Sequence, residues 1–66
     1  MSKMRYLLFD GRWFNSPDDA LVLCTSRTIK EALKDYEMFS QDTVIVYDNV
    51  AVYCEMTKLD LTKGLP

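Results

Sequence analysis

Apolar and polar residues alternate with a helical period between Thr28 and Phe39. The apolar positions recur at steps of three and four residues and form one stripe, while the charged positions face away from it. Thr28 and Glu31 have the spacing of a capping box, in which the Thr28 hydroxyl bonds the Glu31 amide and the Glu31 carboxylate bonds the Thr28 amide. The pattern therefore predicts one amphipathic helix from Ile29 to Phe39. Its apolar stripe consists of Ile29, Ala32, Leu33, Tyr36 and Phe39.

Strand-like segments precede this helix. Met4 to Phe9 is apolar and aromatic, and the following Asp10-Gly11 suits a tight hairpin turn, with Arg12 to Phe14 as a short return strand. Asn15 to Asp19 has turn composition throughout and predicts a loop. Ala20 to Thr25 is nearly continuous in apolar residues and predicts a strand buried in the centre of a sheet.

Two further strands follow the helix. Thr43 to Tyr47 and Val50 to Met56 are rich in β-branched and aromatic residues, and Asp48-Asn49 between them suits a two-residue hairpin turn. Such a turn pairs Tyr47 with Val50 and Ile45 with Val52. Residues 58–66 mix charges with leucines and are expected to form a loose tail.

These elements predict an α+β fold of a single domain spanning residues 1–66. We expect a mainly antiparallel sheet of four to five strands with one α-helix packed on one face, in the order β-β-(β)-α-β-β. The hairpin after the helix is apolar on both faces, whereas one helix covers only one face. The second face is therefore expected to be an apolar interface with a partner or a second copy. Its residues would be Val44, Val46, Ala51 and Tyr53.

Length and composition restrict the class of protein. A chain of 66 residues supplies roughly 3–5 kcal/mol of net stability from one core, so self-association is a realistic means of gaining more. Apolar runs such as Ala20 to Cys24 are far below the ~18 residues of a membrane span, and no signal peptide is recognisable, so we expect a cytoplasmic protein. Cys24 and Cys54 are expected to be buried, inert thiols.

The residues that usually carry chemistry are scarce. The chain has no histidine, which removes the common general base and metal ligand. Cys24 and Cys54 lack metal-ligand spacing, and two glycines cannot build a phosphate-binding loop. Asp18-Asp19 is a carboxylate pair, but such a pair in a proline-containing turn is typical of solvated turn residues. We therefore expect no enzymatic activity, no cofactor and no metal.

Acidic residues are concentrated in the second half of the chain. The segment from Asp35 to Thr57 contains five acids and no Lys or Arg, although the net charge of the whole chain is only −2. Acids at this density either keep a small protein soluble or form a surface that competes with DNA for a basic groove. On the second interpretation the partner-binding residues are Asp35, Glu37, Asp42, Asp48 and Glu55.

Several segments together resemble small reading frames of phages and mobile elements: Tyr6-Leu7-Leu8-Phe9-Asp10-Gly11-Arg12, Ala20-Leu21-Val22-Leu23, Ile29-Lys30-Glu31-Ala32-Leu33-Lys34-Asp35 and Thr43-Val44-Ile45-Val46. Characterised proteins of that kind include anti-CRISPR inhibitors, which occupy a surface of a host effector. The resemblance implies a phage-encoded, non-enzymatic inhibitor of a host nucleic-acid-binding defence complex, acting in the host cytoplasm through an acidic, DNA-mimicking surface.

Two alternatives stay open. The strands leading to Thr28-Ile29-Lys30-Glu31-Ala32-Leu33 resemble HicB-type antitoxins, although the Pro-Gly-Cys turn of those proteins is missing, and this implies a small homodimeric regulatory or structural protein. Strand aromatics such as Tyr6, Phe9, Tyr47 and Tyr53 could instead form a stacking platform for single-stranded nucleic acid. A platform of this kind needs basic residues around it, and the acid-only segment holds two of these tyrosines. We therefore expect no direct binding of nucleic acid.

Overall fold

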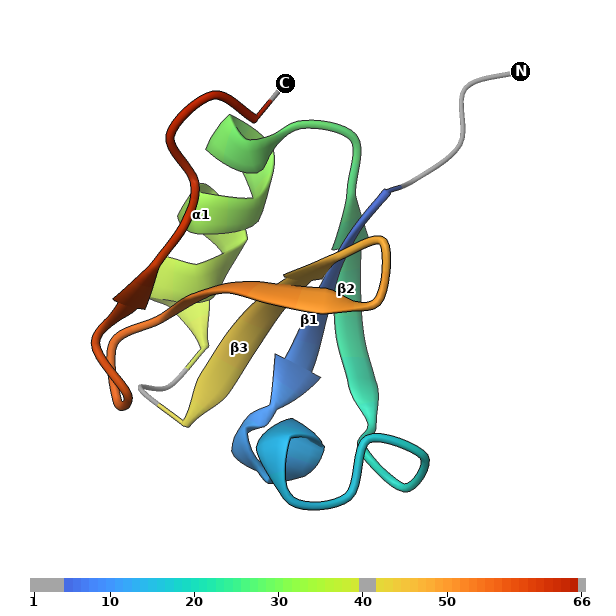
Figure 1. Cartoon of the computed structure of the whole chain (residues 1–66). Coiled ribbons are helices and arrows are strands. Elements are labelled where there is room, and N and C mark those ends of the chain that lie inside the picture. Colours follow the sequence, from blue (N-terminus) through green and yellow to red (C-terminus); the bar gives the residue numbers. More distant parts are fainter. Residues whose placement is uncertain (1–4, 40–41, 66) are drawn as a thin grey trace.

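The computed structural model describes residues 5–39 and 42–65, which form one α-helix packed on a five-stranded antiparallel sheet (Figure 1). Strands β2 and β3 both pair with β1, β4 pairs with β3, and β5 with β4, so the order across the sheet is β2-β1-β3-β4-β5. The predicted α+β class is confirmed. The elements are β1 (Tyr6–Asp10), η1 (Gly11–Phe14), β2 (Val22–Ser26), α1 (Ile29–Met38), β3 (Thr43–Tyr47), β4 (Val50–Cys54) and β5 (Leu59–Asp60).

The helix begins where its capping residues predict. The Glu31 amide donates to Thr28 Oγ1 at 3.3 Å, which satisfies one of the free amides of the first turn. The Glu31 carboxylate accepts from the Arg27 amide at 3.2 Å, one residue earlier than the predicted Thr28. The helix ends at Met38, and Phe39 is its C-cap. Local chemistry therefore fixes the position of α1 to within one residue.

The first core cluster lies between α1 and the sheet. Ala32 and Tyr36 of the helix are buried against Tyr6 and Leu8 of β1 and Ile45 of β3. The Tyr36 hydroxyl accepts a hydrogen bond of 3.0 Å from the amide of Glu55, so the polar end of this buried ring has a partner. Four residues of the predicted apolar stripe, Ile29, Ala32, Leu33 and Tyr36, thus pack on the sheet, whereas Phe39 is 41% exposed.

A second core cluster lies on the opposite face, where the sequence predicts an uncovered surface. Val44 and Val46 are only 0% and 1% exposed. Trp13 of η1 and Leu59 of β5 pack against this cluster, and the Trp13 ring lies 6.2 Å from that of Phe9. The second face is therefore covered by residues of the same chain, and the prediction that it is free is wrong around Val44 and Val46.

A β-bulge divides the hairpin residues between the two faces. Asp48 and Asn49 have φ values of 50° and 65°, as a two-residue turn of this kind requires, and Tyr47 pairs with Val50 as predicted. Further along, the register shifts so that Ile45 pairs with Tyr53, and not with Val52. Tyr53 consequently packs on the helix side, edge to face with Tyr36 at 5.0 Å.

The segment after β1 is a short 3-10 helix, and the predicted return strand from Arg12 to Phe14 is wrong. The Asp10 carboxylate accepts a 2.8 Å hydrogen bond from the Arg12 amide and caps η1. A Cβ atom at Gly11 would collide with the main-chain carbonyl oxygen of Asp42, so glycine permits this close approach to the segment before β3. The capping hydrogen bond and the close approach to Asp42 therefore stabilise a 3-10 helix where the sequence predicts a hairpin.

The C-terminal segment is more ordered than the expected loose tail. Leu59–Asp60 forms β5, and the Leu61 amide donates to the carbonyl of Val52 at 2.6 Å. Lys58 turns the chain with a φ of 56°, and Leu65 packs against the first core cluster. Leucines at 59 and 65 supply the apolar contacts that hold this segment on the sheet.

Candidate functional site

Strand β2 lies at the edge of the sheet, although its sequence predicts a central strand. Among residues 5–39 and 42–65 it pairs with β1 alone, and Figure 1 shows it at the border of the sheet. Leu21, just before the strand, is 62% exposed, and Val22 is 42% exposed. An apolar run of this length is typical of a strand buried on both faces, so these two leading residues are unusual in facing solvent.

The edge of β2 carries no charged or proline residue that would oppose pairing with another strand. Edge strands in soluble proteins commonly carry charged side chains or prolines, contain a β-bulge, or are very short. Val22–Ser26 has five residues, none charged and none proline, although a register shift interrupts its pairing with β1 between Val22 and Cys24. At the other edge, β5 has only two residues and one of them is Asp60. The β5 edge is therefore the better protected of the two, and β2 is the better candidate for strand addition.

A register shift between β1 and β2 interrupts the alternation of side chains along β2. Val22 and Thr25 lie opposite Phe9 and Leu7, on the side of the second core cluster. From Phe9 a row of rings continues through Trp13 to Phe14, with the last two centroids 5.6 Å apart. Phe14 is 38% exposed. We use the term β2 edge surface for Leu21, Val22 and Thr25.

On the helix side, β2 is fixed to α1 by one carboxylate. Asp35 Oδ2 accepts hydrogen bonds from the Ser26 hydroxyl at 3.0 Å and from the Cys24 thiol at 3.2 Å. The hydrogen bond to Asp35, together with burial, raises the pKa of the Cys24 thiol, because both favour its neutral form. The Cys24 thiol is therefore less reactive than an ordinary cysteine, and it contacts the carboxylate that links β2 to α1.

The structure does not gather the five predicted acids on one face. Asp35 points toward β2 at one border of the sheet, and Glu55 follows β4 toward the other. Asp42 and Asp48 flank the two ends of β3, a five-residue strand that spans roughly 17 Å. Glu37 is exposed on α1. This arrangement provides no continuous acidic surface that includes all five.

The four residues predicted as an apolar interface are also separated. Val44 and Val46 lie inside the second core cluster, with Ala51 half-buried beside them. Tyr53 lies on the opposite face, because the bulge in β4 changes its side. A partner could reach Val44 or Val46 only by displacing Trp13 and its neighbours from this core.

Three of the aromatic residues considered for a base-stacking platform, Tyr6, Tyr47 and Tyr53, contact other tyrosines of the chain. Tyr6 is buried, and its ring lies 4.8 Å from that of Tyr47. Burial raises the pKa of the Tyr6 hydroxyl. Arg5 donates to the Tyr47 hydroxyl at 3.4 Å, and Tyr53 contacts Tyr36. Each of these three rings therefore already contacts another tyrosine within the chain.

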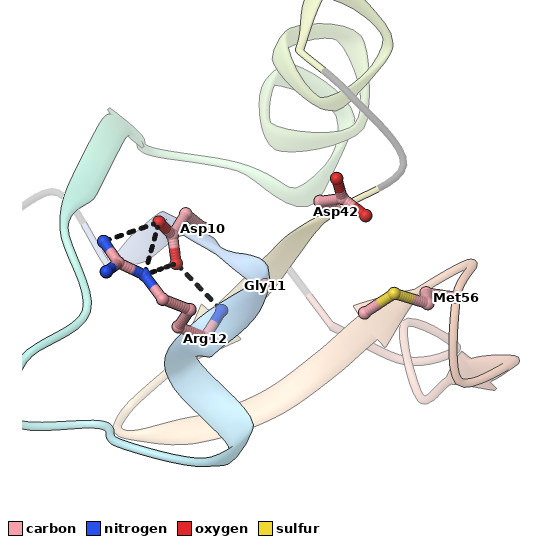
Figure 2. Close-up of a pocket in the computed structure, with 5 residues that line it drawn as sticks. All are labelled: Asp10, Gly11, Arg12, Asp42 and Met56. Atoms are coloured by element: carbon pink, nitrogen blue, oxygen red, sulfur yellow. Dashed lines mark hydrogen bonds and ion pairs between the residues drawn. The ribbon is translucent and has the colours of Figure 1, made fainter.

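An open groove of about 450 Å³ lies beside η1. Figure 2 shows Asp10 and Arg12 facing each other on one side of it and Asp42 and Met56 on the other. Arg12 Nη2 lies 3.2 Å from Asp10 Oδ2, and the bonds from Arg12 lower the pKa of the Asp10 carboxyl, with the main-chain amide contributing most. Because Arg12 is already paired with Asp10, the groove does not present it as a free cation for an anionic ligand.

Within the part of the chain that the structure describes, no three His, Cys, Asp or Glu residues lie close enough to hold a metal ion. No helix among the described residues is long and apolar enough to span a membrane. Comparison with known proteins found no matching family model, no matching curated protein and no matching solved structure. The geometry of the β2 edge surface is therefore the strongest functional indication. The sequence pattern places these residues in a buried central strand, so it does not identify the site.

Proposed function

We propose that this protein is a non-enzymatic interaction module that binds a partner protein by strand addition to β2. The uncharged, proline-free edge of β2 is the observation that carries the proposal. Main-chain hydrogen bonds to an added strand would supply affinity, and the exposed side chains beside the edge would supply specificity. Leu21 and Val22 provide apolar area at the same place.

The partner class that the resemblance to anti-CRISPR inhibitors implies is a host nucleic-acid-binding complex. Strand pairing explains such inhibition better than charge mimicry does, because the five acids are distributed over both borders of the sheet and both ends of β3. The proposal therefore retains inhibition by occupation of a protein surface and assigns that contact to the β2 edge surface.

The test compares two charge insertions that differ in position. Leu21→Lys/Val22→Lys places charges at the β2 edge, and Leu61→Lys places one at a leucine of similar exposure, 56%, after β5. Each tagged variant is immobilised and incubated with a lysate of the host cell and, separately, with the untagged wild-type chain. Circular dichroism verifies that the variants are folded.

We expect wild type and Leu61→Lys to retain the same protein, and Leu21→Lys/Val22→Lys to lose it. Reversing Asp42, Asp48 and Glu55 to Lys should leave this binding in place. A partner that survives the two β2 substitutions and is lost on charge reversal would contradict the proposal and support an acidic mimic instead. Retention of neither a lysate protein nor the untagged chain would also contradict it.

A further inference from the structure

We propose that the strand added to β2 is the β2 strand of a second copy of this chain, paired antiparallel about a two-fold axis. This inference rests on the proposed strand addition to β2 and takes a second copy of the chain, in place of a host protein, as the occupant of that edge. Pairing of this kind joins two five-stranded sheets into one continuous sheet, and each copy contributes the same residues to the contact. The charges that flank β2, and the short β5 strand at the other edge of the sheet, indicate a second copy as the partner of β2.

The residues around β2 are complementary to themselves in the antiparallel direction. Asp18 and Asp19 precede the strand, Arg27 follows it, and all three are exposed. Between Ala20 and Ser26 there is no charge. An antiparallel pair brings the acidic end of each strand toward the end of the partner strand that carries Arg27, whereas a parallel pair would set acids against acids. The charge pattern therefore favours an antiparallel second copy over a parallel one.

The opposite edge of the sheet is a poor alternative for self-association. Pairing β2 of one copy with β5 of the next would use only Leu59–Asp60 and would place Asp60 against an uncharged strand. Such a head-to-tail contact does not close and would generate a filament. Pairing between two β2 strands involves the longer and uncharged strand of the two edges and closes with two copies.

Association also suits the size of the chain. A core built by 66 residues leaves modest net stability, and a second copy adds apolar burial at Leu21 and Val22. The helix α1 already holds the inner side of β2 through Asp35, so the strand is presented in a fixed geometry. A strand held in this way loses less conformational freedom on pairing than a mobile segment.

The first experiment measures the mass of the full chain by sedimentation velocity over a concentration series up to the high micromolar range. We expect wild type and Leu61→Lys to change from monomer to dimer, and Leu21→Lys/Val22→Lys to be monomeric at every concentration. A wild-type chain that is monomeric throughout would overturn the inference. A dimer that survives both β2 substitutions would overturn it as well.

The second experiment uses charge exchange on exposed residues, which leaves the core unchanged. Arg27→Asp makes both ends of the strand acidic, and Asp18→Arg/Asp19→Arg makes both ends basic. Each variant alone should dimerise about tenfold more weakly or worse, because like charges meet twice in each dimer. An equimolar mixture should form heterodimers, which native mass spectrometry resolves by mass, and one chain carrying all three substitutions should regain the wild-type dimer.

Failure of the mixture to form heterodimers, while wild type dimerises, would overturn the antiparallel β2 pairing. The mass measurement and the lysate experiment together separate self-association from binding of another protein at β2. A monomeric wild type that still retains a lysate protein through Leu21 and Val22 contradicts only the second copy as partner. Loss of all β2-dependent retention contradicts both.

Discussion

The Ser26 hydroxyl donates a 3.0 Å hydrogen bond to the Asp35 carboxylate and thereby fixes the edge strand to the helix. Ser26 is buried, and the same carboxylate oxygen accepts from the Cys24 thiol. One acid that the sequence suggested as a partner-binding residue is therefore a structural link between β2 and α1.

Asp35→Ala should destabilise the protein by about 2 kcal/mol, because it removes hydrogen bonds to a charged acceptor and leaves the buried Ser26 hydroxyl without this partner. Urea denaturation followed by circular dichroism gives the free energy of unfolding. Glu37→Ala removes a neighbouring exposed acid of the same helix and should change stability by less than about 0.5 kcal/mol. Equal losses in the two variants would contradict the structural role of Asp35.

The Cys24 thiol should react slowly with iodoacetamide at pH 8, since its pKa is raised and little thiolate is present. Asp35→Asn removes the negative charge next to the sulfur, so the pKa of the thiol should fall and alkylation should become severalfold faster. Mass spectrometry of peptides locates the modified cysteine. The buried Cys54 is the internal control, and its rate should stay low in both proteins.

The same pKa gives a sign for the pH dependence of stability. A thiol whose pKa is raised on folding binds its proton more tightly in the folded state. Its contribution is fully present below the ordinary thiol pKa and is lost as the pH rises through the raised value. The free energy of unfolding should therefore decrease more steeply between pH 8 and 10 in wild type than in Cys24→Ser.

Gly11→Ala should lower the free energy of unfolding by about 1–3 kcal/mol, because the added methyl group would meet the main-chain carbonyl of Asp42, which cannot rotate away. Gly64→Ala is the matched change. Gly64 has a φ of 88° but no atom within 4 Å of the added Cβ, so the expected loss is only about 1 kcal/mol, from backbone strain. Thermal unfolding by circular dichroism compares them. A Gly11→Ala protein as stable as wild type would show that η1 and β3 are less closely packed.

Trp13→Ala should cost about 2–3 kcal/mol, since this ring covers the second core cluster and contacts Phe9. Phe14→Ala, at the exposed end of the same row, should cost less than about 1 kcal/mol. Urea denaturation measures both. The opposite order would mean that the second face of the sheet is not closed by η1.

Local chemistry made some elements predictable. Thr28 and Glu31 identify the start of the helix, because capping involves residues three positions apart in sequence. Asp48 and Asn49 identify the hairpin, because both tolerate the positive φ that its turn requires. The candidate site was less predictable, since Leu21 and Val22 belong to an apolar run that usually indicates burial.

The sequence by itself determined the helix, the hairpin turn and the α+β class, since these depend on neighbours along the chain. Tertiary structure alone decided that β2 lies at an edge, that a bulge moves Tyr53 to the helix side, and that Trp13 covers Val44 and Val46. Whether an apolar strand is buried on both faces depends on which distant strands pair beside it and what packs above it. That choice is made by long-range contacts, which the local pattern does not encode.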